Sequence, residues 1–219
     1  RYHGEFLSIL LILFSIYAVL QLENKPQKRN INFIFISLML SLATFIRPNF
    51  FPTSLLLFIY STFLFINHKK FILLSINLIG FSFIFVSFFH NIYFGNSLIF
   101  FTDANMHFVF SKIFHAFNVY DVQSNFFYTQ LLKWNPIYNL HRLLILIFIT
   151  YYVLLNKHSL STYVLFLCCI SQHLVLLITH PDSRYAYLAW LLTFILFIKV
   201  FYQSNFYFKI KNLIYFLKR

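Results

Sequence analysis

The segment SLATFIRPNFFPTSLLLFIY (residues 41–60) decides the fold class. An apolar run ends just before Arg47 and Pro48, and a second apolar run begins at residue 50. Proline disfavours helical backbone at the residue before it and is well suited to the first turn of a helix. The segment therefore predicts two apolar helices joined by a tight turn that carries a guanidinium group.

Long apolar runs of this kind extend through the whole chain. Hydrophobic residues make up 60% of the 219 positions and charged residues only 10%, whereas about a quarter of the residues in a soluble domain are charged. A helix crosses a bilayer with roughly 17–25 residues. We find seven apolar blocks, at residues 5–22, 31–46, 50–66, 71–89, 141–155, 159–179 and 184–201. The sequence predicts an all-α, polytopic helical membrane protein with about seven transmembrane helices.

The blocks divide the chain into four parts. Residues 1–89 contain four predicted transmembrane helices with the Arg-Pro turn, and residues 141–201 contain three more. Residues 90–140 are too polar to cross a bilayer and rich in aromatic side chains, so we expect an outer-face loop with one or two amphipathic helices at the membrane interface. A solvated connector is the alternative. Residues 202–219 form a basic tail.

The net charge of +12 arises from short clusters of Lys and Arg between the apolar blocks. When successive loops are placed on alternate sides of a membrane, 11 of the 17 basic residues fall on one side, the basic tail included. The positive-inside rule makes that side cytoplasmic, in a plasma (inner) membrane or in the endoplasmic reticulum. Arg47, residues 90–140 and the turn THPDSRY (179–185) then face the periplasm or lumen. This distribution also disfavours nucleic acid as a partner.

Two arginines on the outer side are candidate ligands for an anion. Arg47 and Arg184 each belong to a turn that contains proline. The planar fork of a guanidinium binds two phosphate oxygens at once, which suits a phosphate anchored to a lipid. The alternative is that both side chains extend to lipid headgroups without a specific ligand.

Other polar groups on this side are candidates for acid-base chemistry. Asp103 and Asp121 are the acids of the 90–140 segment, and either could act as a general base for a sugar hydroxyl. The alternative is an ordinary acid in a surface loop. His180 lies two residues from Asp182, a carboxylate that could raise its basicity. Asp182 or Ser183 could instead cap the following helix.

Several site types are absent from the sequence. The histidines assigned to the outer side have no metal-ligand spacing, so no metal is expected; they are His3, His90, His107, His115, His141 and His180. The chain contains only three glycines and no phosphate-binding glycine motif, which disfavours nucleotide chemistry. Cys168 and Cys169 lie inside an apolar block and are expected to be packing residues.

Four stretches resemble the membrane-embedded glycosyltransferases of GT-C architecture, which take sugar from a polyprenyl-phosphate donor at the outer or luminal face. The opening segment resembles the Arg-Pro turn of that family. FFHNIYFGNSLIFFTDANMHF (88–108) resembles a helix that leaves the membrane into an aromatic loop with Tyr-x-Gly and Thr-x-x-Asn. THPDSRYAYLAWLLTFI (179–195) resembles its His-x-acid-x-Arg-aromatic turn, and YHGEFLSILLILFSIY (2–17) its Glu-containing helix start.

The resemblance is greatest to the mannosyltransferases of the glycophosphatidylinositol and N-glycan pathways and their bacterial relatives. Protein O-mannosyltransferases and aminoarabinose transferases are the next candidates. The implied reaction moves a sugar, such as mannose, to a glycan, lipid or protein acceptor. The sugar carbon is inverted by direct displacement and the lipid phosphate leaves.

The resemblance also implies roles for individual residues. Arg47 and Arg184 would bind the donor phosphate, and residues 90–140 would shape the acceptor site. The residues implied to line the same cavity are Glu5, Tyr93, Asn105, His180 and Asp182. In this family the catalytic acid follows the first helix, in a region that would precede Arg1, so we expect the sequence to be the C-terminal part of a longer enzyme and to be inactive alone. The usual proline downstream of Arg184 is also missing.

Two other functional classes remain open. A transporter of lipids or oligosaccharides would be expected to show internal repeats or helices broken by Gly and Pro near the middle of the membrane. Here glycine is scarce and the prolines lie near the ends of the apolar blocks, which disfavours transport. A non-catalytic membrane subunit would tolerate loss of Arg47 and Arg184, whereas the enzyme would not.

Overall fold

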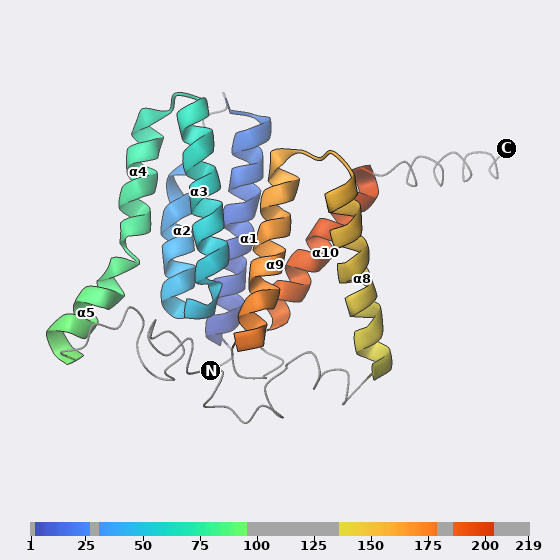
Figure 1. Cartoon of the computed structure of the whole chain (residues 1–219). Helices are drawn as coiled ribbons and strands as arrows, with labels where there is room; N and C mark the ends of the chain where they lie inside the picture. The colour runs from blue at the N-terminus through green and yellow to red at the C-terminus, as the bar shows by residue number, and fades with distance from the viewer. Residues whose placement is uncertain (1–2, 27–30, 96–135, 179–185, 204–219) are drawn as a thin grey trace.

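The computed structural model describes residues 3–26, 31–95, 136–178 and 186–203, and the regular structure in these residues is helical (Figure 1). The all-α prediction is confirmed for this part of the chain. The elements are α1 (His3–Asn24), α2 (Asn32–Ile46), the short 3-10 helix η1 (Pro48–Phe50), α3 (Phe51–Asn67), α4 (Phe71–Ser82), α5 (Phe85–Gly95), α8 (Pro136–Leu155), α9 (Leu160–Ile178) and α10 (Ala186–Gln203).

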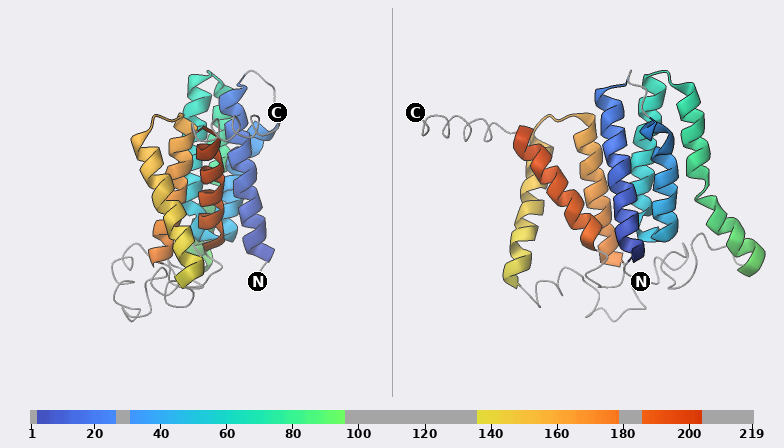
Figure 2. Two further views of the ribbon diagram at one scale, coloured as in Figure 1. Left: turned by 90° about the vertical axis from the view of Figure 1, so that its right-hand side faces the viewer. Right: turned by 180° about the vertical axis from the view of Figure 1, so that it is seen from behind.

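The helices pack as an antiparallel bundle in which α3 and α9 join the two halves. Helices α1 to α4 pack together, α9 packs against α3, and α10 packs against both α9 and α8 (Figures 1 and 2). Because neighbouring helices run in opposite directions, one end of the bundle holds the starts of α1, α3, α8 and α10 and the ends of α2 and α9. We name this the Arg47 end, and the opposite end the Lys69 end.

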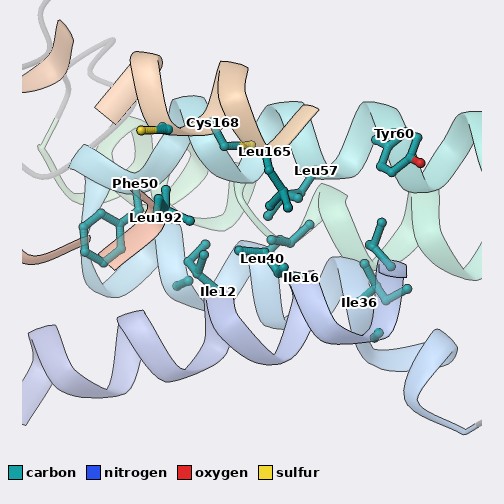
Figure 3. Packing of buried hydrophobic residues seen from close by; sticks show 14 of the residues in the cluster. Ile12, Ile16, Ile36, Leu40, Phe50, Leu57, Tyr60, Leu165, Cys168 and Leu192 are labelled. Carbon is teal, nitrogen blue, oxygen red and sulfur yellow. The ribbon is translucent and has the colours of Figure 1, made fainter. Parts of the chain in front are cut away.

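A single apolar core runs through the bundle and includes residues from both halves of the chain. Close packing brings Ile12 of α1 and Leu40 of α2 near Leu57 of α3, and Leu165 of α9 and Leu192 of α10 belong to the same cluster (Figure 3). The two halves, although separated in sequence by residues 96–135, therefore form one packed unit.

The helices bury hydroxyl groups beside the apolar core and expose many large apolar side chains. Hydroxyl groups are buried on most of the helices; they belong to Ser8, Ser15, Ser37, Ser41, Thr44, Thr53, Ser54, Ser61, Ser161, Thr162 and Thr193. Large apolar side chains point outward, among them Phe6, Ile72, Ile79, Leu154 and Phe194, each more than half exposed. A water-soluble monomer rarely exposes apolar patches above a few hundred Å².

Two segments in the described residues, Gly4–Asn24 and Pro48–Asn67, are long and apolar enough to cross a membrane by length and composition. The other apolar helices are shorter. The number of spans expected from the seven apolar blocks therefore stays a prediction.

The fourth apolar block, 71–89, is not one helix. Helix α4 ends at Ser82 and α5 begins at Phe85 with a change of direction (Figure 1). At the break, the amides of Ile84 and Val86 donate to carbonyls three residues earlier instead of four, and Ser82 Oγ donates to the Ile79 carbonyl at 2.6 Å. Helix α5 then continues to Gly95, so the first residues of the 90–140 segment are helical, as are its last residues from Pro136.

Helices α2 and α4 approach closely at Gly80. A Cβ atom at this position would lie 2.3 Å from Ser37 Oγ and 3.2 Å from the Leu38 amide nitrogen. Ser41 Oγ donates to the Gly80 carbonyl at 2.8 Å. Small residues at a helix contact allow the backbones to approach, which is typical of helices that associate in membranes.

Candidate functional site at the Arg47 end

The site is built on the turn between α2 and α3. Arg47 has an extended backbone (φ −138°, ψ 93°), as expected for a residue before proline, and this conformation ends α2. Its amide still donates to the Ala43 carbonyl at 2.9 Å. Pro48 begins η1, and the Phe50 amide donates to the Arg47 carbonyl at 3.0 Å. Hydrogen bonds from the Arg47 amide and to the Arg47 carbonyl therefore fix the backbone of this residue.

The side chain of Arg47 forms an ion pair with Glu5. Arg47 Nη2 lies 2.7 Å from Glu5 Oε1, with the arginine side chain 25% exposed and the glutamate side chain 8% exposed. Glu5 lies in the first turn of α1, where the helix dipole favours a carboxylate. The carboxylate is therefore the buried partner, and the guanidinium is the more accessible one.

A glycine beside Glu5 permits this meeting of α1 with the end of α2. A Cβ atom at Gly4 would lie 3.3 Å from Ile46 Cγ2, tighter than an ordinary contact. Ser8 Oγ donates to the Gly4 carbonyl at 2.7 Å, so this hydroxyl is satisfied within its own helix. The close approach brings Glu5 within reach of the residue that follows Ile46.

Helix α9 is tied to the same turn by buried polar contacts. Gln172 Nε2 donates to the Asn49 carbonyl at 3.1 Å, and Gln172 is 1% exposed. Nearby, Thr53 Oγ1 donates to the Cys168 carbonyl at 3.5 Å. The turn that carries Arg47 is therefore held by α1 through Glu5 and by α9 through Gln172.

A second polar cluster, made by His173, Thr193, Cys169 and Trp190, joins α9 to α10. Thr193 Oγ1 lies 2.9 Å from His173 Nε2 and 3.2 Å from Cys169 Sγ, and it donates its own proton to the Ala189 carbonyl at 2.8 Å. Because a hydroxyl has one proton, the imidazole and the thiol must both donate to Thr193. This hydrogen-bond pattern corresponds to the Nε2–H tautomer of His173. Its ring also meets Trp190 edge to face, with centroids 4.8 Å apart.

An apolar hollow of about 540 Å³ lies on the side of the bundle formed by α1 and α2. Its lining residues are Leu10, Leu11, Leu13, Phe14, Tyr17 and Met39. Leu10 is five residues beyond Glu5, which is about 7.5 Å along the helix axis. Leu10 is also about 140° around the helix from Glu5, so the hollow and the ion pair lie on different faces of α1.

The structure brings two of the predicted site residues together and places a third apart from them. Arg47 and Glu5 meet at the Arg47 end. Tyr93 lies on α5, which bends away from the bundle, and is 78% exposed. The other predicted site residues lie outside the described part of the chain: Asp103, Asn105, Asp121, His180, Asp182 and Arg184. Within that part, no group of three His, Cys, Asp or Glu residues could hold a metal.

The polar residues that hold the Arg47 turn to α9 and α9 to α10 were not among the predicted site residues. Gln172 and His173 lie in the apolar block 159–179, and Thr193 lies in the block 184–201. The dipeptide Gln-His inside an apolar run was the sequence feature that could have identified them. Polar side chains within a membrane helix usually face the bundle interior and have a function.

Comparison with protein-family models, with curated proteins and with solved structures finds no match for this chain.

Proposed function

We propose that the chain is a multi-pass integral membrane protein. The burial pattern supports this proposal: outward-facing Phe, Leu and Ile side chains suit contact with lipid, and buried hydroxyls suit helix association where lipid supplies no hydrophobic driving force. Its orientation follows from the lysines at the Lys69 end. Lys25, Lys69, Lys70, Lys157 and Lys199 lie toward this end, and the positive-inside rule makes it cytoplasmic.

At the opposite, non-cytoplasmic end, the ion pair of Arg47 and Glu5 supports a site for a lipid-linked phosphate. The buried carboxylate pairs with the guanidinium, which is the more exposed of the two groups. Arginine recognises phosphate through two parallel hydrogen bonds. Further along α1, the apolar hollow lined by Leu10, Phe14 and Tyr17 suits contact with a hydrocarbon chain. The chain thus acts as the membrane-embedded part of a GT-C glycosyltransferase that uses a polyprenyl-phosphate-linked sugar.

Topology is tested by labelling single cysteines with a membrane-impermeant maleimide. Asn49→Cys at the Arg47 end and Lys69→Cys at the Lys69 end are introduced where Cys168 and Cys169 have been replaced by Ser. In intact cells or sealed vesicles, the two positions are expected to label from opposite sides. Equal labelling from one side in intact membranes would contradict the membrane-spanning arrangement.

Ligand binding is tested in lipid nanodiscs with undecaprenyl phosphate, and with undecaprenol as the control lipid. The phosphate lipid is expected to raise the thermal midpoint of the wild-type chain, and undecaprenol is not. Arg47→Ala is expected to abolish the shift, whereas Lys157→Ala at the other end retains it. Binding that survives Arg47→Ala, with normal membrane insertion, favours a non-catalytic subunit whose arginine only anchors a helix.

A further inference from the structure

The apolar hollow between α1 and α2 opens to the outside of the bundle. The two helices pack against each other. The residues that line the hollow run from Leu10 to Tyr17 on α1, with Met39 from α2. Leu10 is 44% exposed and Tyr17 is 55% exposed. The volume of about 540 Å³ is within the range of pockets that hold small ligands, about 300–1,000 Å³.

The rim of the hollow nearer the Lys69 end is polar. Tyr17 lines the hollow, and its hydroxyl oxygen accepts a hydrogen bond from Gln21 Nε2, one turn later on α1. A hydroxyl that accepts one bond can still donate its own proton. Lys25 follows one further turn along and is exposed, and its amide still donates to the Gln21 carbonyl at 2.9 Å. Because residues four apart share a helix face, these three side chains continue the hollow toward the Lys69 end.

The distances along α1 correspond to one leaflet of a bilayer. At a rise of about 1.5 Å per residue, Leu10 lies about 22 Å from Lys25 along the helix axis. Half of a hydrocarbon core about 30 Å thick is about 15 Å, and one headgroup region adds about 5–8 Å. With Lys25 among the headgroups, Leu10 lies near the middle of the membrane. The hollow then occupies the hydrocarbon half of the leaflet on the Lys69 side.

We propose that the hollow and its polar rim bind one anionic phospholipid from this leaflet. A hydrocarbon chain of the lipid fills the hollow, and the Tyr17 hydroxyl donates to an ester carbonyl of the glycerol backbone. The Lys25 ammonium pairs with the phosphate and favours a headgroup without a cation of its own. The occupant is distinct from the donor lipid, because the hollow and Glu5 lie on different faces of α1 and the polar rim points away from the Arg47 end (Figure 1).

The inference rests on the membrane-spanning arrangement proposed above, but not on the sugar donor. Two competing occupants are the polyprenyl chain of the donor and a second copy of this protein packed through α1 and α2. The test must therefore report on lipid contact at the hollow itself and compare it with another outward-facing position.

The test measures quenching of a single tryptophan by brominated lipids. Trp134 and Trp190 are replaced by Phe, and Tyr17→Trp supplies a reporter at the rim that keeps a donor group. The full chain is reconstituted in bilayers that contain brominated phosphatidylglycerol or brominated phosphatidylcholine. The binding constant for phosphatidylglycerol at this position is expected to be about fivefold that for phosphatidylcholine, the preference that one lysine beside an anionic lipid supplies. Lys25→Gln is expected to remove this preference, whereas Lys157→Gln at the same end retains it.

Tyr151→Trp on α8 is the matched control. Tyr151 is 65% exposed, belongs to the part of α8 nearer the Lys69 end and does not line the hollow. In the same background, a tryptophan at this position is expected to be quenched equally by the two brominated lipids, because it contacts lipid without a specific site.

The two reporters separate failure of the inference from failure of the membrane proposal. Quenching at neither position would contradict the membrane-spanning arrangement itself. Quenching at residue 151 but not at residue 17 would show that protein covers the hollow. Equal quenching by both lipids at residue 17, or the same preference at residue 151, would show ordinary lipid contact. Relief of quenching at residue 17 by undecaprenyl phosphate, but not by unbrominated phosphatidylglycerol, would assign the hollow to the donor. Each of the last three results would overturn the inference.

Discussion

Gln172 on α9 donates a hydrogen bond to the backbone carbonyl of Asn49, two residues beyond Arg47. This contact connects α9 directly to the turn that presents the arginine. In the sequence, α9 leads into the HPDSR motif at residues 180–184. The buried amide of Gln172 thus links the turn to the helix that precedes that motif in the sequence.

Replacing Gln172 by Leu is expected to loosen the Arg47 turn without removing the helix. The partly buried Asn49 carbonyl would lose this donor, which costs about 1 kcal/mol. Hydrogen exchange read by mass spectrometry should show faster exchange in peptides covering residues 47–53. Ser171→Ala, one position earlier on α9, is the control, because Ser171 bonds only within its own helix, to the Cys168 carbonyl. Unchanged exchange in Gln172→Leu would show that the turn is held by its other contacts alone.

Thr193 is expected to be sensitive to loss of its hydroxyl but not to loss of its methyl. Thr193→Val removes the shared acceptor of His173 and Cys169, at a cost of about 1–3 kcal/mol. Thr193→Ser keeps the acceptor and should be much less destabilised. Fluorescence of Trp190 in a Trp134→Phe background reports the change locally, because the His173 ring meets Trp190. Equal effects of Val and Ser would contradict the assigned network.

A larger side chain at Gly80 is expected to separate α4 from α2. The contact with Ser37 leaves no room for a branched chain, and overpacking of this kind costs about 1–3 kcal/mol. Gly80→Leu should therefore lower the thermal midpoint in detergent, and Gly80→Ala should do so less because the Ser37 hydroxyl can move. Ile79→Leu, at an outward-facing position, is the control and should be neutral. A neutral Gly80→Leu would show that the two helices do not meet this closely.

Lys69→Gly is expected to stabilise the protein. The end of α3 has the two bonds of a Schellman motif, from the Lys70 amide to the Phe65 carbonyl at 2.9 Å and from the Lys69 amide to the Ile66 carbonyl at 3.0 Å. The motif places Lys69 at φ 54°, in the left-handed region, where glycine is more favourable by about 1 kcal/mol. The thermal midpoint should rise in Lys69→Gly and not in Lys69→Ala, which has the same loss of charge but retains a Cβ.

The apolar blocks predicted most helices well because their ends carry strong local signals. Pro48 marks the start of the segment after α2, and Pro136 opens α8, a few residues before the predicted block. The break at residues 83–84 was missed because SFIF has no proline, glycine or charge. Phe81, just before the break, and Ile84, within it, are both buried, a tertiary feature that local sequence does not reveal.

The candidate site was predictable only in part, for a physical reason. Arg47 and Glu5 are charged residues at the ends of apolar blocks. Assigning successive loops to alternate sides of a membrane therefore predicts that both lie on the same side. The partners of the turn could not be found in this way. Gln172 and Thr193 lie inside blocks whose composition indicates lipid contact, and only the packed structure distinguishes an inward-facing position from an outward-facing one.

The buried hydroxyls bear on the order in which the molecule assembles. Ser8, Ser15, Thr44 and Thr150 each donate to a carbonyl four residues earlier in their own helix. In the membrane-spanning arrangement proposed above, a helix with such self-satisfied hydroxyls would enter the bilayer without needing a neighbour to bond them. The bonds of Asn77, Gln172 and His173 instead reach other elements. These three side chains lack their hydrogen-bond partners until their helices pack together. An incompletely assembled chain would therefore present unpaired polar groups that proteases or chaperones can recognise.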